Sequence, residues 1–451
     1  MTQAQMRLGL FVLNTGHHVA SWRDPGTSPA AFIPFDHLRR LAQTAERGLF
    51  DVIFLADAAG VPDLDSETLS RTDRATFFEP STTAAALAVT TEHIGIVFTQ
   101  NTTYDQPYHV ARRVLAIDHL SGGRVGCNLV TGVSRTEALN FNHRDMPAHA
   151  DRYSRAEEFA EVVLGLWRSW DADAFPVDRE SGRFLDPAGM HVLDHHGEHF
   201  TVRGPLNVAP SPQGMPVMVQ AGGSEPGRAL AARHAEMIYT VQGDLDSAQA
   251  FYADVKGRMA AHGRSPDALK VMPGLFAIVG RTRAEAEDKL AALQALVDPV
   301  VGLSFLQSLV GSDIDLSRYD FDEPLPADLS TNFGTSQLKV LQEATRRGNM
   351  TLRELSRFAV GARGHWRLCG TAEDIADQME ERFRGKAADG FNLMPATIPG
   401  GVEDFVDLVV PELQRRGLFR TRYEGRTLRD HLGLATPDNS RRAAGSEGSA
   451  S

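Results

Sequence analysis

Short apolar runs alternate with helix-like patterns along most of the chain. Each run has the length and composition of a buried strand, and most are followed by a segment with the spacing of an amphipathic helix. The eight runs are RLGLFVLN (7–14), DVIFLAD (51–57), IGIVFTQ (94–100), RVGCNLVTG (124–132), PVMVQ (216–220), MIYTVQ (237–242), KVMPGLFAIVG (270–280) and GFNLMP (390–395). Helices are expected at about 35–48, 81–91, 107–121 and 151–170.

This alternation predicts the fold. Strands that alternate with helices pair in parallel through right-handed crossovers, and eight such units indicate a (β/α)8 TIM barrel, here over residues 1–435. The chain of 451 residues is longer than a typical barrel of about 250. We assign the surplus to insertions at about 171–213 and 296–350, and we expect the second to act as a lid. Residues 436–451 have almost nothing to bury and predict a disordered tail.

Composition narrows the function classes. The formal net charge of −12 argues against nucleic acid and anionic membrane as partners. Cys127 and Cys369 are far apart and form no CxxC pair, so neither a disulfide framework nor a zinc site is indicated. No apolar run reaches transmembrane length, and we expect a cytoplasmic protein.

Strand ends are where a barrel of this class carries its active site. The polar residues predicted there, such as Thr103 and Asn128, are uncharged apart from Asp57. Such a lining suits a bound cofactor better than it suits hydrolysis. An alternative to a site role remains for both segments. In it, Asp57 only caps a loop or a helix, and NTTYDQP (101–107) is only the start of a helix.

The segment AGGSEPG (221–227) joins the fifth predicted strand to a helix. Small residues and a hydroxyl at a helix start fit an anion, and a phosphate monoester fits better than a dinucleotide because the G-x-G-x-x-G spacing is absent. A glycine turn with Ser224 as a simple cap remains open. His149 and Tyr153 of HADRY lie four residues apart on one helix face and could grip a phosphate or ring edge, unless Tyr153 only begins the apolar stripe.

One histidine-rich segment invites a metal interpretation. HHGEH (195–199) lies in the first insertion without ligand spacing or a supporting carboxylate. We interpret it as solvated loop histidines and predict no metal site.

Several long segments together resemble the bacterial luciferase-like flavin monooxygenases, in the group of the nitrilotriacetate, EDTA, dibenzothiophene-sulfone and long-chain alkane monooxygenases and the pristinamycin synthase large subunit. They include SGGRVGCNLVTG (121–132), HADRYSRAEEFAEVVLGLWRSW (149–170) and AADGFNLMPATIPGGVEDF (387–405). The resemblance implies FMN, reduced by a separate NAD(P)H:flavin reductase, O2, and insertion of one oxygen atom into a small organic substrate. It also implies a homodimer or homotetramer.

The same resemblance implies roles for particular residues. FMN contacts fall on Asp57, Thr103, Asn128, His149, Tyr153, Gly223 and Ser224, with the phosphate at Ser224. NTGHHVASWR (14–23) matches a substrate-facing loop, so His17, His18, Trp22 and the later His365 are pocket candidates. His17, His18, His149 and His365 are the acid–base candidates, and the choice among them stays open. Cys127 replaces the Trp of many relatives, which predicts a roomier pocket, although a buried filler role fits it too.

Two further readings of function remain. A deazaflavin-dependent oxidoreductase of the same superfamily would bind deazaflavin in preference to FMN. A flavin-binding protein without turnover would bind FMN tightly and insert no oxygen. A metal-dependent hydrolase is disfavoured because the strand ends lack His and Asp ligands. The identity of the substrate is not readable from the sequence.

Overall fold

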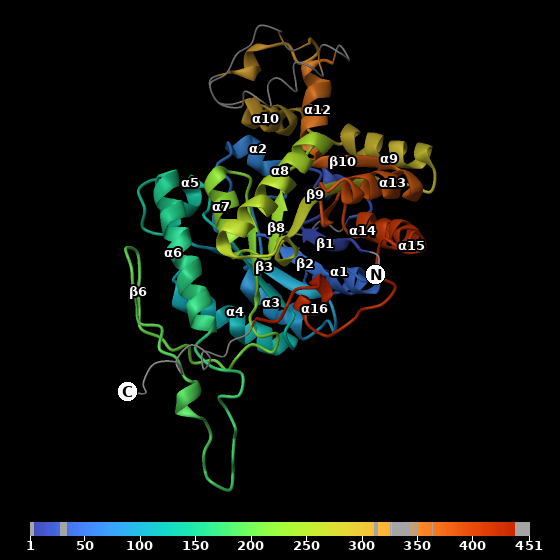
Figure 1. Cartoon of the computed structure of the whole chain (residues 1–451). Coiled ribbons are helices and arrows are strands. Elements are labelled where there is room, and N and C mark those ends of the chain that lie inside the picture. The colour runs from blue at the N-terminus through green and yellow to red at the C-terminus, as the bar shows by residue number, and fades with distance from the viewer. Residues whose placement is uncertain are drawn as a thin grey trace.

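The computed structural model describes residues 4–27, 34–310, 314–324, 326, 345, 350–362 and 364–437. Its centre is a closed barrel of eight parallel strands, which confirms the predicted fold (Figure 1). In order around the barrel, the strands are β1 (Arg7–Val12), β2 (Val52–Leu55), β3 (Gly95–Asn101), β4 (Val125–Val130), β7 (Val217–Ala221), β8 (Met237–Thr240), β9 (Lys270–Val279) and β11 (Gly390–Pro395). The barrel closes where β11 pairs with β1, with Leu8 opposite Phe391.

Helices surround the barrel because alternate strand residues face outward and are apolar. Leu8 and Leu10 of β1, for example, pack in the outer layer between sheet and helices, while Val52 and Phe54 of β2 face the barrel interior. The surrounding helices are α1 (Phe35–Arg47), α3 (Pro80–Ala88), α4 (Pro107–Ser121), α5 (Arg135–Asn140), α6 (His149–Trp167), α7 (Glu225–His234), α8 (Leu245–Arg258), α9 (Arg283–Ala295), α13 (Ala372–Arg384), α14 (Gly400–Asp404) and α15 (Val410–Arg415). Short helical turns are η1 (Ser21–Arg23), η3 (Met259–His262), η4 (Pro266–Ala268) and the π-helical η6 (Phe405–Val409). The four helices predicted from the sequence are present within a few residues.

A ninth strand, β10 (Trp366–Gly370), was not predicted. It pairs with the second half of β9, from Leu275 to Val279, beyond the point where the pairing of β8 ends at Pro273. The strand is short and is followed at once by the capping box of α13, so the sequence offers only a five-residue signal. It carries Arg367 and follows directly on His365, which brings both residues to the barrel.

The first insertion is an extension that projects from the barrel (Figure 1). It contains η2 (Pro187–Gly189) and an antiparallel hairpin of β5 (His195–His196) and β6 (Thr201–Val202). The carboxylate of Glu158 on α6 lies 2.9 Å from Nε2 of His195 and accepts from the backbone N–H of His199 (2.8 Å). The expectation of solvated histidines without a carboxylate is therefore wrong for His195, because the spacing rule looked only within the loop. His196 is exposed, as expected.

The second insertion stands above one end of the barrel (Figure 1). It contains α10 (Pro299–Val310), η5 (Leu316–Arg318) and α12 (Leu352–Ala362), and α10 contacts α2 (Ser66–Ser70). A small core of its own includes Leu306, Leu352 and Leu355, and a second contact packs Val301 and Val360 against Val19 of the loop after β1. The lid role and the domain limits stay predictions, since 327–344 and the tail from 438 onward lie outside the described residues.

The opposite end of the barrel is closed by α16 (Leu428–Leu432). Leu428 and Leu432 pack against the interior strand residues, including Val97. The fully buried Arg429 holds this plug in place, because its Nη1 and Nη2 each donate to Glu236 at 2.7 Å and its Nε donates to the Met215 carbonyl at 2.8 Å. The floor of the barrel therefore depends on a bidentate buried ion pair.

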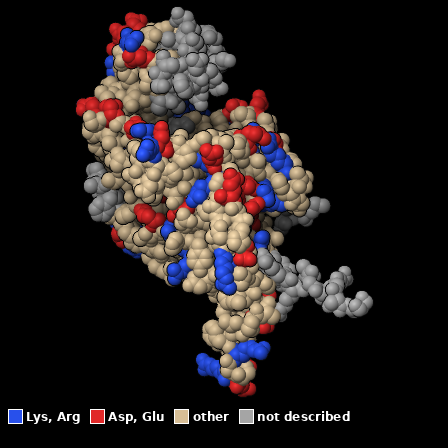
Figure 2. Space-filling model, turned by 90° about the vertical axis from the view of Figure 1, so that its left-hand side faces the viewer, with Lys and Arg blue, Asp and Glu red and all other residues tan. Residues whose placement is uncertain are grey.

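Two observations concern the charged side chains on the surface and the hydropathy of the helices. Basic and acidic side chains are interspersed on the face drawn in Figure 2, rather than gathered by sign. Across the residues that the structure describes, no single helix is long and apolar enough to cross a membrane. One pair, α9 and residues 299–307 of α10, passes only when taken together across a 93° bend.

We expect Arg429→Met to destabilise the protein strongly, because it leaves Glu236 partly buried without its partner. The loss should be about 3 kcal/mol, the lower range for breaking a buried ion pair. Denaturant unfolding measures it. Arg422→Met is the matched control, since Arg422 is exposed on the same C-terminal segment and should change stability by less than about 0.5 kcal/mol. Equal stability of the two variants would contradict this account of the floor.

Candidate functional site

The carboxyl ends of the eight strands form the rim of the barrel below α10 and α12. Around that rim, β7 lies four strands from β1 in either direction, so the turns that follow these two strands face each other. The predicted site residues divide between these two sides and the floor of the mouth between them.

Ser224 and Tyr153 meet at the turn after β7. Ser224 is the N-cap of α7 and its hydroxyl accepts from the backbone N–H of Gly227 at 3.3 Å. The Tyr153 hydroxyl, from the second turn of α6, lies 3.0 Å from Ser224 Oγ. The His149 ring lies 4.7 Å from the Tyr153 ring, centroid to centroid, and is exposed. Three residues that the sequence proposed for phosphate binding are thus together in space.

The glycines of this turn keep a space open beside the two hydroxyls. A Cβ at Gly227 would lie 3.1 Å from Ser224 Oγ and 3.2 Å from the Tyr153 hydroxyl, whereas a Cβ at Gly223 would meet nothing within 4 Å. Gln220 is almost fully buried beneath the turn, its Nε2 donates to the Ala221 carbonyl, and its Oε1 has no hydrogen-bond partner. At the start of α7 the Gly227 N–H donates to Ser224 and Pro226 has no N–H, so the Glu225 N–H is the backbone donor left for a ligand. This N–H and the hydroxyls of Ser224 and Tyr153 fit a phosphate group, whereas Gln220 Oε1 is an acceptor and does not contribute.

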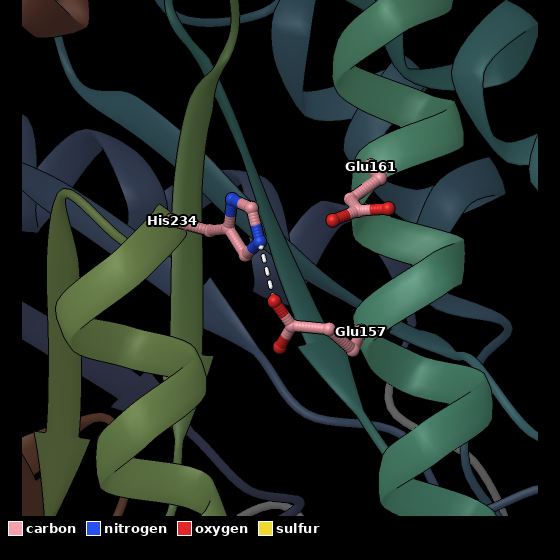
Figure 3. A group of neighbouring side chains, drawn as sticks. All are labelled: Glu157, Glu161 and His234. Atoms are coloured by element: carbon pink, nitrogen blue, oxygen red, sulfur yellow. Dashed lines mark hydrogen bonds and ion pairs between the residues drawn. The ribbon is translucent and has the colours of Figure 1, made fainter. Parts of the chain in front are cut away.

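An ion-paired cluster joins the two helices behind this turn. Glu157 and Glu161 of α6 and His234 of α7 lie together, with His234 Nε2 2.9 Å from Glu157 (Figure 3). Their potential ligand atoms all lie within 4.8 Å of one another. Arg233 already pairs with both glutamates, at 2.5 Å and 2.6 Å. The cluster is therefore a contact that fixes α7 against α6, and so fixes Ser224 relative to Tyr153.

Asp57 and Thr103 lie on the adjoining part of the rim, after β2 and β3. Burial raises the pKa of Asp57 to about 6, the N–H of Ala58 opposes this, and the charge of Glu137 adds to it. The hydroxyl of Thr103 donates to the Thr131 carbonyl at 2.7 Å, which ties the loops after β3 and β4 together. Asp57 is thus a carboxyl that changes charge near neutral pH at the mouth of the barrel.

Asn128 faces the barrel interior one layer below the rim. Its Nδ2 donates to Thr99 Oγ1 at 3.0 Å, and its Oδ1 is buried without a partner. Cys127, the next residue back, packs outside the barrel with Leu129 in the helix-facing layer. The expectation that Cys127 enlarges the pocket is therefore wrong, because strand alternation turns it away from the mouth. Burial raises the pKa of the Cys127 thiol. The thiol therefore stays protonated, which fits a role as a small buried side chain that fills the core.

His17 and His18 follow β1 on the opposite side of the rim. Nε2 of His17 donates to the Phe11 carbonyl at 3.0 Å. His18 is fully buried, and burial together with the positive charges of Arg74 and Arg367 lowers its pKa to about 4. His18 is thus neutral at pH 7, which disfavours it as the proton donor among the four candidate histidines.

His365, the fourth candidate, lies against the backbone of β9. A Cβ at Gly274 would stand 2.2 Å from His365 Nδ1, so only glycine admits the imidazole there. His365 is thereby held close to β9 and to Met394 of β11. His17 and His365 share this side of the rim, whereas His149 lies by the Ser224 turn.

Three residues of the site were not singled out from the sequence. Gln220 ends an apolar run, and a polar residue at the end of a predicted barrel strand was the signal that could have marked it as a site residue. Glu137 is almost fully buried and accepts from the Ala59 N–H at 3.0 Å, which joins the loops after β2 and β4. Arg74 lies 19 residues beyond the end of β2, and nothing in its local pattern marks it.

Known proteins resemble this chain over nearly its whole length. Residues 6–389 match a family model described as luciferase-like monooxygenase. The chain is 49% identical to the N-acetyl-S-(2-succino)cysteine monooxygenase of Bacillus subtilis over 96% of this chain and 98% of the relative. It is 47% identical to nitrilotriacetate monooxygenase component A of Aminobacter aminovorans, over 97% and 98%. A crystal structure of riboflavin lyase with modified FMN and riboflavin superposes with a TM-score of 0.83 at 33% identity, covering 96% of each chain.

The raised pKa of Asp57 predicts a pH-dependent stability difference. Between its ordinary value near 4 and about 6, the folded state binds the proton that the unfolded state has released, so wild-type stability falls as pH rises through this window. The Asp57→Asn substitution removes this pH-dependent contribution to stability. The melting temperature of the variant minus that of wild type should increase from pH 4 to pH 6.5 and level off above it. A difference that is constant across this range would contradict the assignment.

Proposed function

The chain belongs to the luciferase-like monooxygenase family, and we propose that it is the oxygenating component of a two-component system. In this proposal a separate NAD(P)H:flavin reductase supplies reduced FMN, and one atom of O2 enters a small organic substrate. The name component A of the nitrilotriacetate relative supports a division between two proteins. A homodimer or homotetramer and a cytoplasmic location belong to the same proposal.

The turn at 221–227 is the observation that carries the assignment of FMN. It combines a helix start, two hydroxyls 3.0 Å apart and an open glycine. Ser224, Gly223, Tyr153 and His149 would hold the phosphate end. Asp57, Thr103 and Asn128 would adjoin the rest of the cofactor. The superposition with a structure that holds modified FMN supports this choice.

Reduced FMN, when bound, supplies the electrons that activate O2. The protein itself needs to bind, orient and exclude water. The contact of Val301 and Val360 with Val19 places the second insertion directly on the loop that carries His17 and His18. His17 and His365 remain the histidines on the substrate side that are candidates to move a proton.

We expect Ser224→Ala to weaken FMN binding about tenfold, because it removes a hydroxyl from the phosphate site. It also costs about 1 kcal/mol of stability through loss of the N-cap. Thr282→Ala is the matched control, since Thr282 caps α9 in the same way through the Glu285 N–H but lies outside the site. Fluorescence titration with FMN measures the affinity. Equal FMN affinity in the two variants would remove Ser224 from the site.

The reaction itself is tested by reconstitution. Protein, FMN, NADH and a flavin reductase are combined with N-acetyl-S-(2-succino)cysteine, nitrilotriacetate or dibenzothiophene sulfone. We expect one class to give an oxygenated product and to suppress release of hydrogen peroxide. Tight FMN binding without product from any class would favour the flavin-binding alternative, and preference for deazaflavin over FMN in a parallel titration would favour the deazaflavin-dependent one.

A further inference from the structure

Three basic side chains from separate segments lie near one another on the side of the rim opposite Ser224. They are His18 in the loop after β1, Arg74 in the loop after β2, and Arg367 on β10, and we call them the basic cluster. Both guanidinium charges act on His18, which places the three groups within electrostatic reach of one another. They come together at the carboxyl ends of the strands, where a barrel of this class binds its substrate.

Arg74 has hydrogen-bond donors without partners although it is only 6% exposed. Its Nη2 donates to the Gly16 carbonyl at 2.9 Å, while Nε and Nη1 make no hydrogen bond to any residue that the structure describes. Arg124 near the barrel floor is similarly buried, at 3% exposure, and makes five hydrogen bonds to carbonyls and a threonine hydroxyl. All three guanidinium nitrogens of Arg124 are thus hydrogen-bonded, whereas two nitrogens of Arg74 have no hydrogen bond to the described residues.

One carboxylate lies near Arg74 in the part of the chain that the structure describes. Asp73 Oδ1 is 3.3 Å from Arg74 Nε, and Asp73 is the charged group that acts on Arg74. Oδ2 of Asp73 is held by the Thr15 hydroxyl at 2.7 Å and by the Thr15 N–H at 3.3 Å. Asp73 therefore offsets one positive charge and is fixed toward the β1 loop. Arg367 adds a second guanidinium to the cluster.

His18 adds a neutral donor. The Ala20 N–H donates to Nδ1 of His18 at 3.3 Å, so the neutral ring carries its proton on Nε2. That nitrogen is buried and has no hydrogen-bond partner within the described part of the chain. An N–H donor on a fully buried ring, beside the buried guanidinium of Arg74 and the half-buried one of Arg367, is suited to an oxyanion and unsuited to an apolar or cationic group.

We propose that the basic cluster binds a carboxylate of the substrate, and hence that this monooxygenase acts on organic acids. The inference rests on the proposed function, since it assigns the substrate of that same site. The turn for the FMN phosphate is on the facing side of the rim, so the two anionic groups occupy separate positions. A substrate held by its carboxylate at the β1–β2 side presents the rest of its structure to the centre of the mouth, above Asn128.

Paired acids and esters test this proposal directly. The probes are nitrilotriacetate and N-acetyl-S-(2-succino)cysteine, each compared with its methyl ester, and binding to the purified protein is measured by calorimetry with and without FMN. Wild type should bind at least one acid ten times more tightly than its ester. Arg74→Gln should weaken acid binding at least tenfold and change ester binding and FMN affinity less than twofold. Arg74→Lys should recover part of the preference.

Two further variants make the outcome decisive. Arg367→Gln should also lower the preference for the acid over its ester. This variant replaces Arg74→Gln as the test if circular dichroism shows that Arg74→Gln is unfolded. Arg264→Gln is the control, because Arg264 is a half-buried arginine bonded to carbonyls near the other end of the barrel. The proposal would be overturned if wild type bound the acids and their esters equally well. It would also be overturned if the preference for the acid survived in folded Arg74→Gln and Arg367→Gln variants. Failure of FMN to bind would instead count against the proposed function, because acid binding is measured without FMN too.

Discussion

Closure of the sheet between β11 and β1 is the constraint on which the site depends. In a closed parallel barrel every strand edge is paired, and all eight carboxyl ends must lie on one rim. At this closure Gly9 leaves room for Asn392 of β11, because a Cβ there would lie 2.7 Å from the Asn392 side-chain oxygen. The closure brings the loop after β1 over β11, where the His17 N–H donates to the Pro395 carbonyl at 2.8 Å. Residues separated by hundreds of positions thereby line one mouth.

Buried polar groups occur at both ends of the barrel. At the floor, Arg429 and Arg124 are bonded to carboxylates, hydroxyls or backbone carbonyls, and these contacts hold the plug and the helices together. At the rim, Gln220, Asn128, His18 and Arg74 each retain a buried atom without a partner. Because unsatisfied buried groups are costly, those at the mouth are candidates for groups that ligands complete. The N–H donors of His18 and Arg74 fit a carboxylate, whereas the amide oxygens of Gln220 and Asn128 are acceptors and fit a donor on a ligand.

The sequence predicted the part of this architecture that is local. Strand and helix periodicity placed all eight barrel strands, and the small-residue turn placed Ser224. It missed β10, whose five residues give little signal, and it placed Cys127 on the wrong face because the strand register was not considered. Arg74 was missed for a different reason: its role arises from burial and from contacts with Gly16 and Asp73, which only the folded chain creates. Glu158 likewise supports His195 from a helix 37 residues earlier.

In the proposed function this chain transfers an oxygen atom from O2 by means of bound reduced FMN. A single-turnover reaction tests it without a reductase: the protein is loaded anaerobically with reduced FMN and substrate and then mixed with 18O2. We expect one 18O atom in the product, as measured by mass spectrometry, and we expect the yield of this product to fall when FMN binding is weakened. Product that carries oxygen from water, or unchanged substrate with all the oxygen released as hydrogen peroxide, would contradict it.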